Sequence, residues 1–289
     1  MKIPHLVQYQ GSKRNIASEI IKCFPEKFSR LIEPFAGTAA ISIATAKINS
    51  ESTFILNDLN KPLAKLLKLI ISNPEYVFNE YEKIWNEQHN ESLEHYYQIR
   101  EKFNREKDPV LFLYLLARCV KGAVRYNSNG CFNQSPDKRR KGTRPETMKK
   151  NILGIYSLLK DRTQFYSMDY KNILSMAKKG DLIYLDPPYQ GVCGERDSRY
   201  FAGIEHNEFI EEIKKLNEKE IDFIISYDGT CGNKSYGKKL PEDLDLIHTG
   251  LKAGRSTQAT LLGKNEFTIE SIYLSKLLSP HNNLILQTA

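Results

Sequence analysis

The stretch Asp181-Leu-Ile-Tyr-Leu-Asp186-Pro187-Pro188-Tyr189 decides the fold that this sequence predicts. Its apolar run, 182–185, is typical of a strand that is buried on both faces of a parallel sheet. The two prolines that follow fix their own φ angles, and a residue that precedes proline favours an extended backbone. The stretch therefore predicts a strand that ends in a stiff turn. Open α/β sheets bind their ligands at this carboxyl end of the strands.

The turn carries two hydrogen-bond acceptors and an aromatic ring. Asp186 offers a carboxylate, the carbonyl of Pro187 has no competing N–H from Pro188, and Tyr189 offers a flat ring. This set suits a planar group that carries an NH₂, such as a nucleobase. Accepting both amine hydrogens would draw the nitrogen lone pair out of conjugation and aim it at an electrophile. Four residues are weak evidence on their own, and a plain strand-terminal turn with a surface Tyr is the alternative.

Two earlier segments predict half of a nucleotide-binding βαβ unit. Residues 31–44 read as a strand, a tight turn at Gly37 and a helix, and the strand 53–57 is followed by Asp58, 21 positions after Gly37. In dinucleotide-binding folds an acid about 20 residues beyond the turn bonds a ribose hydroxyl. The pair therefore indicates a site for an adenosine-containing cofactor. Asp58 could instead cap the helix that begins near residues 60–62.

The amino terminus predicts a helix that continues through Ile21, with Ser12 as its N-cap after the turn residue Gly11. A helix start beside Lys13 is a natural anion site, for example for a carboxylate. An ordinary capped surface helix is the alternative.

The middle of the chain predicts a helical domain inserted into the α/β frame. Residues 60–159 contain four segments of helical apolar spacing and almost no strand signals, and the α/β rhythm returns after residue 160. We therefore expect a discontinuous α/β domain, 1–59 and 160–289, and a helical domain, 60–159. The expected helices are 63–71, 76–85, 93–103 and 110–120, and the expected later strands are 164–168, 222–227, 244–247 and 269–274, with a loop over 228–237.

One part of the insertion has the composition of a nucleic-acid surface. Asn129-Gly130 predicts a hairpin near 125–133, and residues 138–144 hold five cations in seven positions. Arg and Asn can read base edges while cations meet phosphates, although a solvated basic loop is the alternative. The loop 190–204 is either a lid or a plain connection. The expected DNA-binding residues are Arg125, Asn127, Asn133, Lys138, Arg139, Arg140 and, from a second basic segment, Arg255.

The composition is consistent with such a partner. A net charge of +7 and a pI near 8.9 favour a polyanionic ligand. Five cysteines without C-x-x-C spacing and six scattered histidines argue against a disulfide framework and a metal site. Neither a signal peptide nor a membrane-spanning apolar run is visible, so we expect a cytoplasmic protein.

Taken together, the motifs resemble the Dam-type (alpha-group) adenine-specific DNA methyltransferases in order and spacing. The resemblance implies a Rossmann-like methyltransferase domain with an inserted, mostly helical target-recognition domain. It implies methyl transfer from S-adenosyl-L-methionine to the 6-amino group of a flipped adenine in double-stranded DNA. The matching segments are Tyr9-x-Gly-Ser-Lys13, Glu33-Pro-Phe-Ala-Gly37, Asp58-Leu-Asn, Asp108-Pro with Leu111-Phe-Leu-Tyr114, Arg125-Tyr-Asn127 with Gly130-x-Phe-Asn133, and Asp186-Pro-Pro-Tyr189.

The resemblance also assigns roles by position. Asp186, Pro187 and Tyr189 are the expected catalytic residues. The expected cofactor-binding residues are Tyr9, Lys13, Glu33, Phe35, Gly37, Asp58, Asp169 and Asp186.

Three departures from the Dam pattern are visible. Ala39 replaces a turn glycine, and Cys119-Val-Lys-Gly122 stands where Dam enzymes have a Tyr-Asn-Gly element that helps to enter the duplex. The segment 255–262 looks more like methyltransferases of restriction–modification systems, which implies a cognate restriction endonuclease as a partner. The target sequence cannot be carried over.

Three rival functions stay open on the sequence. A cytosine amino-methyltransferase more often has Ser before Pro-Pro-Tyr, and a protein or RNA amide methyltransferase more often has Asn there. A non-catalytic DNA-binding protein on a methyltransferase fold is the third.

Overall fold

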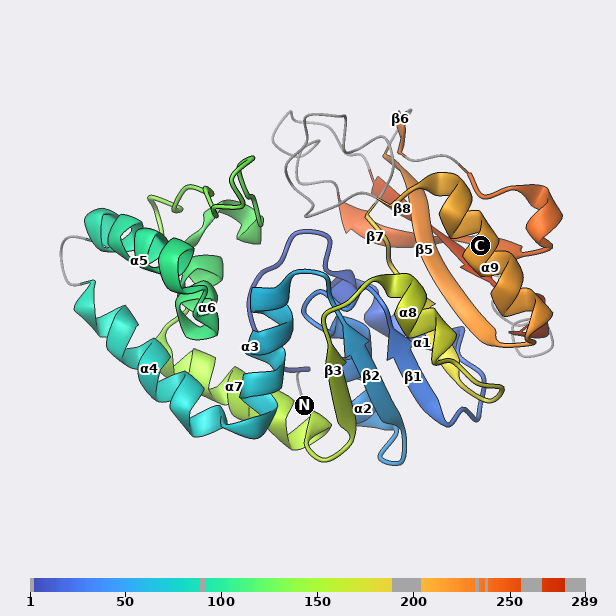
Figure 1. The fold of residues 1–289 in the computed structure, drawn as a ribbon, viewed down its shortest axis with the longest axis horizontal. Coiled ribbons are helices and arrows are strands. Elements are labelled where there is room, and N and C mark those ends of the chain that lie inside the picture. The colour runs from blue at the N-terminus through green and yellow to red at the C-terminus, as the bar shows by residue number, and fades with distance from the viewer. Residues whose placement is uncertain are drawn as a thin grey trace.

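The computed structural model describes residues 3–88, 92–188, 204–231, 234–236, 239–255 and 267–278. Within them, eight strands form one sheet in the order β3-β2-β1-β4-β5-β8-β7, with β6 paired to β5 at one end (Figure 1). The strands are β1 (Arg30–Glu33), β2 (Thr53–Asn57), β3 (Thr163–Tyr166), β4 (Leu182–Leu185), β5 (Asp222–Cys231), β6 (Lys234–Tyr236), β7 (Ile247–Arg255) and β8 (Phe267–Leu274).

The strand order reverses between β1 and β4, and this reversal determines where a binding crevice forms. The chain runs outward from β1 through β2 to β3, and β4 then returns to the other side of β1, all in parallel. β5 continues in parallel beside β4, β8 is antiparallel to its neighbours β5 and β7, and β6 is antiparallel to β5. In such sheets a crevice opens where the order reverses, outside the carboxyl ends of β1 and β4. The Rossmann-like α/β fold expected from the sequence is confirmed.

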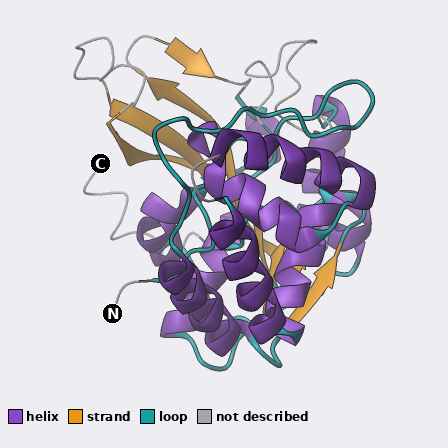
Figure 2. Cartoon of the chain, turned by 90° about the vertical axis from the view of Figure 1, so that its left-hand side faces the viewer, coloured by secondary structure: helices purple, strands orange, loops and turns teal. Residues whose placement is uncertain are grey.

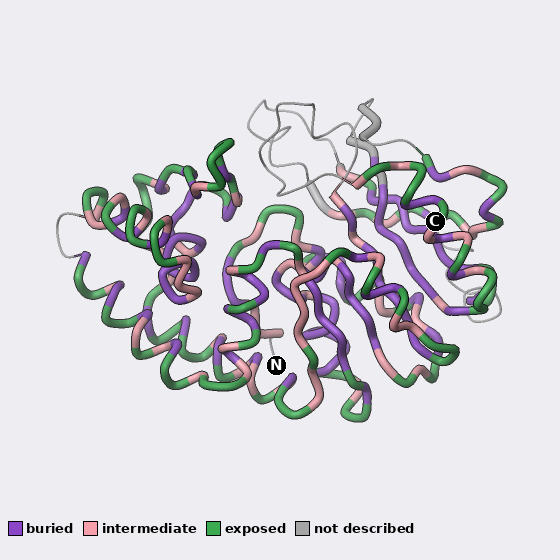
Figure 3. The backbone as a smooth tube through the Cα atoms, viewed as in Figure 1, coloured by how far each residue is buried: buried purple, intermediate pink, exposed green. Residues whose placement is uncertain are grey.

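Alternate residues of the strands pack into two cores on opposite faces of the sheet, as the two-residue period of a strand requires. Leu31, Phe54 and Leu182 share one core with helices α1 (Ala17–Lys22) and α2 (Ala40–Ile48). Their neighbours Ile32, Ile55 and Ile183 share the other core with α8 (Tyr170–Ser175) and α9 (His206–Glu218). Figure 3 shows the central strands β1, β2 and β4 as continuously buried, whereas the edge strand β3 has no buried residue.

Five α-helices separate β2 from β3 in the part of the chain that is described, and they lie together beyond the β3 edge of the sheet (Figure 1). Figure 2 shows the molecule with this side toward the viewer. The central helix α6 is buried on nearly every side, which explains its continuous apolar run Val110–Leu116. It begins after Asp108, whose carboxylate accepts from Val110 N at 2.7 Å and caps the helix. The four predicted helices of this region are present as α3 (Lys61–Ser72), α4 (Pro74–Glu87), α5 (Ser92–Glu106) and α6 (Pro109–Arg118), and a fifth helix, α7 (Pro145–Leu159), was not predicted.

The carboxyl-terminal part corrects two predictions. The expected loop 228–237 is wrong, because β5 continues to Cys231 and β6 follows it. Gly229 makes this extension possible: a Cβ there would lie 2.6 Å from the carbonyl oxygen of Ile269, so only glycine lets β8 approach. The expected strand 244–247 is also wrong, since Glu242–Leu244 is a 3₁₀ turn and β7 begins at Ile247. Asp245 is left-handed, with φ of 52°, and cannot continue a strand.

The amino-terminal helix is shorter than predicted. Lys13–Asn15 is a 3₁₀ turn (η1), the α-helix begins only at Ala17, and Ser12 makes no side-chain cap bond. The side chain of Lys13 turns inward and is buried. None of the described helices combines the length and the apolar character needed to cross a membrane.

Candidate active site and nucleic-acid interface

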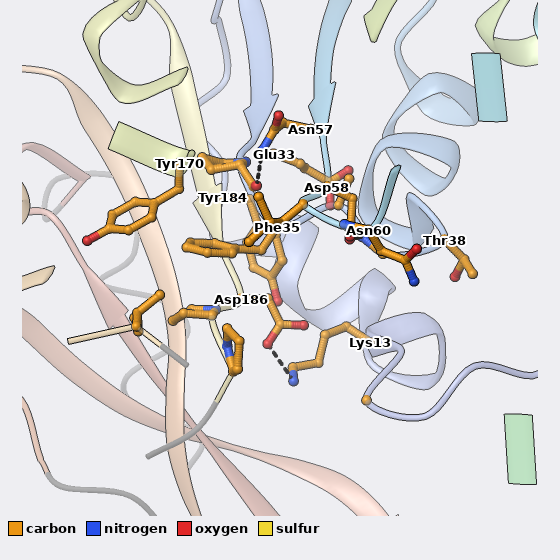
Figure 4. Close-up of a pocket in the computed structure, with 18 of the residues that line it drawn as sticks. Lys13, Glu33, Phe35, Thr38, Asn57, Asp58, Asn60, Tyr170, Tyr184 and Asp186 are labelled. Atoms are coloured by element: carbon orange, nitrogen blue, oxygen red, sulfur yellow. Dashed lines mark hydrogen bonds and ion pairs between the residues drawn. The ribbon is translucent and has the colours of Figure 1, made fainter. Parts of the chain in front are cut away.

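A cavity of about 350 Å³ lies at the carboxyl ends of β1, β2, β3 and β4, where the strand order reverses (Figure 4). Each strand contributes the residues that directly follow it, and the amino-terminal segment 9–13 closes the cavity. Of the residues predicted from the sequence, the structure brings Tyr9, Lys13, Glu33, Phe35, Gly37, Asp58, Asp169, Asp186 and Pro187 to its wall.

Asp186 sits in a buried cluster of charges. Its Oδ1 lies 2.8 Å from Nζ of Lys13, and the same Nζ lies 2.7 Å from Oε1 of Glu270 on β8. Burial raises the pKa of Asp186 to about 6, although the ammonium of Lys13 opposes this shift. Burial by itself would lower the pKa of Lys13, but the charges of Asp186 and Glu270 outweigh it, and the net shift is upward. At neutral pH the cluster therefore holds an ionised Asp186 beside a charged Lys13.

Glu33 serves the turn between β1 and α2. Its Oε1 accepts from Ser42 N at 2.8 Å, in the first turn of α2. Ala39 stands at the N-cap position of this helix, where it offers no side-chain acceptor and is left-handed, with φ of 56°. Burial raises the pKa of Glu33 to about 7, and the hydrogen bonds from Ser42 oppose the rise. Glu33 therefore accepts a hydrogen bond from a free backbone N–H at the start of α2, which Ala39 cannot do.

Asp58 joins the ends of β1 and β2. Its Oδ2 accepts from Gly37 N at 2.9 Å and its Oδ1 from Asn60 N at 2.8 Å. Burial raises the pKa of Asp58 to about 6, while these two bonds pull it down. The N-cap of α3 is Asn60, so Asp58 is not the helix cap that was its alternative interpretation. Its carboxylate lies on the cavity wall, 21 positions from the glycine that it binds.

Aromatic side chains supply the apolar wall. A Cβ at Gly37 would lie 3.5 Å from the ring of Tyr9, so this ring covers the turn. The rings of Phe35 and Tyr170 lie 5.2 Å apart, and the buried hydroxyl of Tyr170 has no hydrogen-bond partner among the described residues. Asp169 is exposed at the rim and caps α8 through Lys171 N at 2.9 Å.

The predicted hairpin is present. Tyr126 and Phe132 form an antiparallel bridge, Asn127 N donates to Cys131 O at 2.9 Å, and Asn133 N donates to Arg125 O at 3.0 Å. The three residues predicted to meet DNA here, Arg125, Asn127 and Asn133, are exposed. In Figure 1 this green segment stands at the upper left, across from the orange strands β5 and β8.

The basic loop rests on a buried arginine. Arg118 is 1% exposed and its guanidinium donates to the carbonyls of Asp137, Arg140 and Ser92. The side chains of Arg139 and Arg140 are 89% and 70% exposed, and their contacts with Asp137 are long, at 3.8 and 3.6 Å. Arg118 thus fixes the loop backbone from below and leaves the loop cations in solvent. Lys138 is exposed in the same way.

Part of the predicted site lies outside the described residues. Tyr189, most of the loop 190–204 and the segment 256–262 lie outside the described residues. Arg255 ends β7 opposite Phe267, but its side chain lies outside the described part as well. Among the residues that are described, no cluster of His, Cys, Asp and Glu could hold a metal ion.

Glu270 is the site residue that the sequence analysis missed. It stands in β8 two positions before Ile272 and four before Leu274, both buried in the same core. An acid on the apolar face of a strand is the signal that would have found it.

Comparison with known proteins decides the family. Residues 9–253 match the family model described as D12 class N6 adenine-specific DNA methyltransferase. The chain belongs to this family. It is 31% identical over 262 residues to the DNA adenine methylase of Escherichia coli strain K12, covering 87% of this chain and 90% of that protein. It is 28% identical over 239 residues to the DNA adenine methylase of Haemophilus influenzae, covering 78% and 80% of the two chains.

Membership of the D12 class settles two sequence predictions. The expected Dam-type family is confirmed, and the reaction is methylation of the N6 amino group of adenine in DNA. Among the rival functions, the family description favours adenine over cytosine, over amide substrates and over a purely binding role. The chain therefore acts on DNA and requires a methyl donor.

Proposed function

We propose that this enzyme transfers the methyl group of S-adenosyl-L-methionine to the 6-amino group of an adenine flipped out of duplex DNA, with Asp186 and the carbonyl of Pro187 as the acceptors for the amine. The observation that carries the proposal is the position of Asp186. Its carboxylate is held by Lys13 at the end of β4, and it shares one cavity with Asp58. Figure 4 shows the two acids on the wall of the same pocket.

The residues of the cavity fit the proposed cofactor. A volume of about 350 Å³ lies in the range of small-molecule sites. Asp58 is a carboxylate at the end of β2 that would hold ribose hydroxyls, and Phe35 and Tyr170 are rings that would flank the purine. The unpartnered hydroxyl of Tyr170 is a buried polar group of the kind that a ligand satisfies. Tyr9, Lys13, Glu33, Gly37 and Asp169 complete the proposed set. When bound, the cofactor supplies an electrophilic methyl group on a sulfonium.

The chain's own residues prepare the amine. With a pKa of about 6, Asp186 is ionised at neutral pH and accepts a hydrogen bond from the N6 amine. The Pro187 carbonyl accepts the second hydrogen, and Tyr189 stacks on the base. Both bonds turn the nitrogen lone pair toward the methyl group, so the rate comes from orientation and a fixed electrostatic environment.

The helical part is the proposed DNA target-recognition domain. Residues 60–159, with the hairpin 125–133 and the exposed cations of 138–144, would bind the duplex, and residues 1–59 with 160–289 would form the catalytic domain. The exposed arginines of the loop would bind phosphates, and these contacts would position the protein on the duplex. Arg125, Asn127 and Asn133 would hydrogen-bond base edges. Taking the base out of the stack is required before its amine can enter the cavity.

A restriction endonuclease acting on the same site is the proposed partner. The resemblance of the segment 255–262 to methyltransferases of restriction–modification systems supports this pairing. The segment Cys119-Val-Lys-Gly122 supports a target sequence other than that of Dam enzymes. Mapping of the methylated sequence, followed by protection of methylated DNA against nucleases from the same source, tests the pairing. A methylated site that no such nuclease cleaves would count against it.

The decisive experiment uses methyl-labelled S-adenosylmethionine and unmethylated plasmid DNA, digested to nucleosides after reaction. We compare the protein with Asp186→Asn and with Asp161→Asn, a carboxylate that is 83% exposed and outside the cavity. Label in N6-methyladenine is expected from the parent and the control, and a loss of about 10²–10³-fold from Asp186→Asn. Label in cytosine would contradict the proposed substrate. Cofactor binding without label in DNA would contradict the reaction.

A further inference from the structure

Three charged side chains from distant parts of the chain meet at the wall of the cavity. Lys13 comes from η1, Asp186 from the end of β4 and Glu270 from the middle of β8. The side chains of Lys13 and Glu270 are 9% and 10% exposed, and that of Asp186 is 19% exposed. Asp186 is thus the most exposed of the three. Asp186 and Lys13 line the cavity, and Glu270 contacts Lys13 from β8.

Glu270 is not needed to neutralise Lys13. Asp186 already pairs with that ammonium, so Glu270 adds an excess negative charge to a nearly closed site. Burying a charge without full compensation costs free energy. Its Oε1 also lacks a hydrogen bond of good geometry from any described residue, so its 2.7 Å contact with Lys13 acts through charge.

The fold is adapted to seat this carboxylate. Gly229 of β5 lies opposite Glu270, and its missing side chain lets β8 approach. The β5–β8 register shifts between Ser226 and Gly229. Ser226 forms a hydrogen bond of 2.7 Å with the hydroxyl of Tyr184. The side chain of Tyr184 lies beside the charge cluster.

We propose that Glu270 is a positioning residue that acts through Lys13 and keeps Asp186 a strong acceptor for the adenine amine. The inference rests on the role proposed above for Asp186. A lysine paired with one carboxylate draws negative charge toward itself and weakens that carboxylate as an acceptor. A second carboxylate on the same ammonium competes for it, so Asp186 keeps more of its basicity.

Four groups from four elements bear on Asp186 electrostatically. Lys13 lowers its pKa and Glu270 raises it. Glu33 on β1 also interacts with Asp186, since the charge of Asp186 contributes to the raised pKa of Glu33. Tyr184 on β4 stays neutral, because burial holds its pKa well above the usual range. Lys13 and Glu270 are therefore the pair whose balance sets the acceptor strength of Asp186.

The test compares the full chain with Glu270→Gln and with Ser271→Ala, the next residue of the same strand, whose side chain points to the other face. The first readout is the carboxyl ¹³C titration of Asp186, assigned with Asp186→Asn. Removing the Glu270 charge should raise the acid dissociation constant of Asp186 about tenfold. Ser271→Ala should leave it unchanged.

The second readout is the pH profile of methyl transfer. In Glu270→Gln, kcat should fall about tenfold at pH 8, its acid limb should move to lower pH, and KM for DNA should not change. A merely structural defect would lower kcat equally at every pH. Glu270→Asp keeps the carboxylate but moves it away from Lys13 by the length of one methylene. It should shift the Asp186 titration in the same direction as Glu270→Gln, but by less. This variant provides the test if Glu270→Gln fails to fold.

An unchanged Asp186 titration in Glu270→Gln overturns the inference, as does a loss of activity that is independent of pH. A parent protein that methylates no DNA refutes the proposed function instead, and the titration still decides the role of Glu270.

Discussion

Replacement of Lys13 by Met tests how much the buried charge cluster contributes to stability. Methionine keeps a long unbranched side chain and removes only the ammonium. Lys13 Nζ lies 2.8 Å from Asp186 and 2.7 Å from Glu270. At an effective dielectric constant of about 20, each contact is worth about 6 kcal/mol before the cost of desolvation. Desolvation and the repulsion between the two acids offset most of this sum. Removing one partner of a buried pair costs about 3–5 kcal/mol, and we expect that loss at pH 8.

The pH dependence has a definite sign. Without Lys13, the pKa of Asp186 should rise above its present value of about 6, further from its unfolded value. A carboxyl whose folded pKa is raised binds its proton more tightly in the folded state, so stability is gained as pH falls through that pKa. The cost of Lys13→Met should therefore shrink between pH 8 and pH 5.5.

Urea unfolding at the two pH values measures both effects. Lys22→Met is the matched control, because Lys22 and Glu19 also lie 2.7 Å apart but are 60% and 47% exposed. That variant should lose less than about 1 kcal/mol. The double variant Lys13→Met, Asp186→Asn should regain part of the loss at pH 8. A loss for Lys13→Met equal to that of the control, or one that does not depend on pH, would refute the reasoning.

Three further predictions address the turns, the cofactor and DNA. Gly122→Ala should cost about 2–4 kcal/mol in urea unfolding, because its Cβ would lie 1.9 Å from a backbone carbonyl oxygen at a φ of 60°. Gly130→Ala, at φ of 69° with open space around it, should cost only about 1 kcal/mol. Asp58→Ala should weaken binding of S-adenosylhomocysteine about 10- to 100-fold by calorimetry, through loss of a charged hydrogen bond; unchanged binding would remove Asp58 from the site. Arg139→Ala, whose side chain is 89% exposed, should lower the slope of log affinity for DNA against log salt by about 1, and an unchanged slope would show that it meets no phosphate.

Local patterns predicted the parts of the structure that local forces decide. The run 182–185 is a buried strand because nothing but apolar side chains fits between two cores. The 21-residue spacing placed Asp58 against Gly37 because a βαβ unit brings the ends of adjacent parallel strands together. The hairpin 125–133 was predicted from Asn129-Gly130, and its turn runs from Asn127 to Gly130, where the glycine takes a φ of 69°.

The failures lie where distant segments decide the structure. Residues 228–231 have no apolar pattern, yet they extend β5, because β8 packs against the bare backbone at Gly229. Ser12 has the residue type of a cap but caps nothing, since Lys13 is drawn inward by Asp186 and Glu270. No local pattern joins residue 13 to residue 270, so the partner of Lys13 could only be found in three dimensions.

Two contacts tie the proposed DNA surface to the cavity. Gln10 N donates to Gly122 O at 3.1 Å, and the hydroxyl of Tyr126 donates to Oδ1 of Asn60 at 3.2 Å. Asn60 N is itself bonded to Asp58, and Gln10 lines the cavity. The hairpin region and the proposed cofactor pocket are thus joined through Gln10 and Asn60, so a displacement of either region moves the other. An enzyme that must hold a base and a methyl donor in line needs such a shared support, because misplacement of the reacting atoms by about 1 Å costs about 10²-fold in rate.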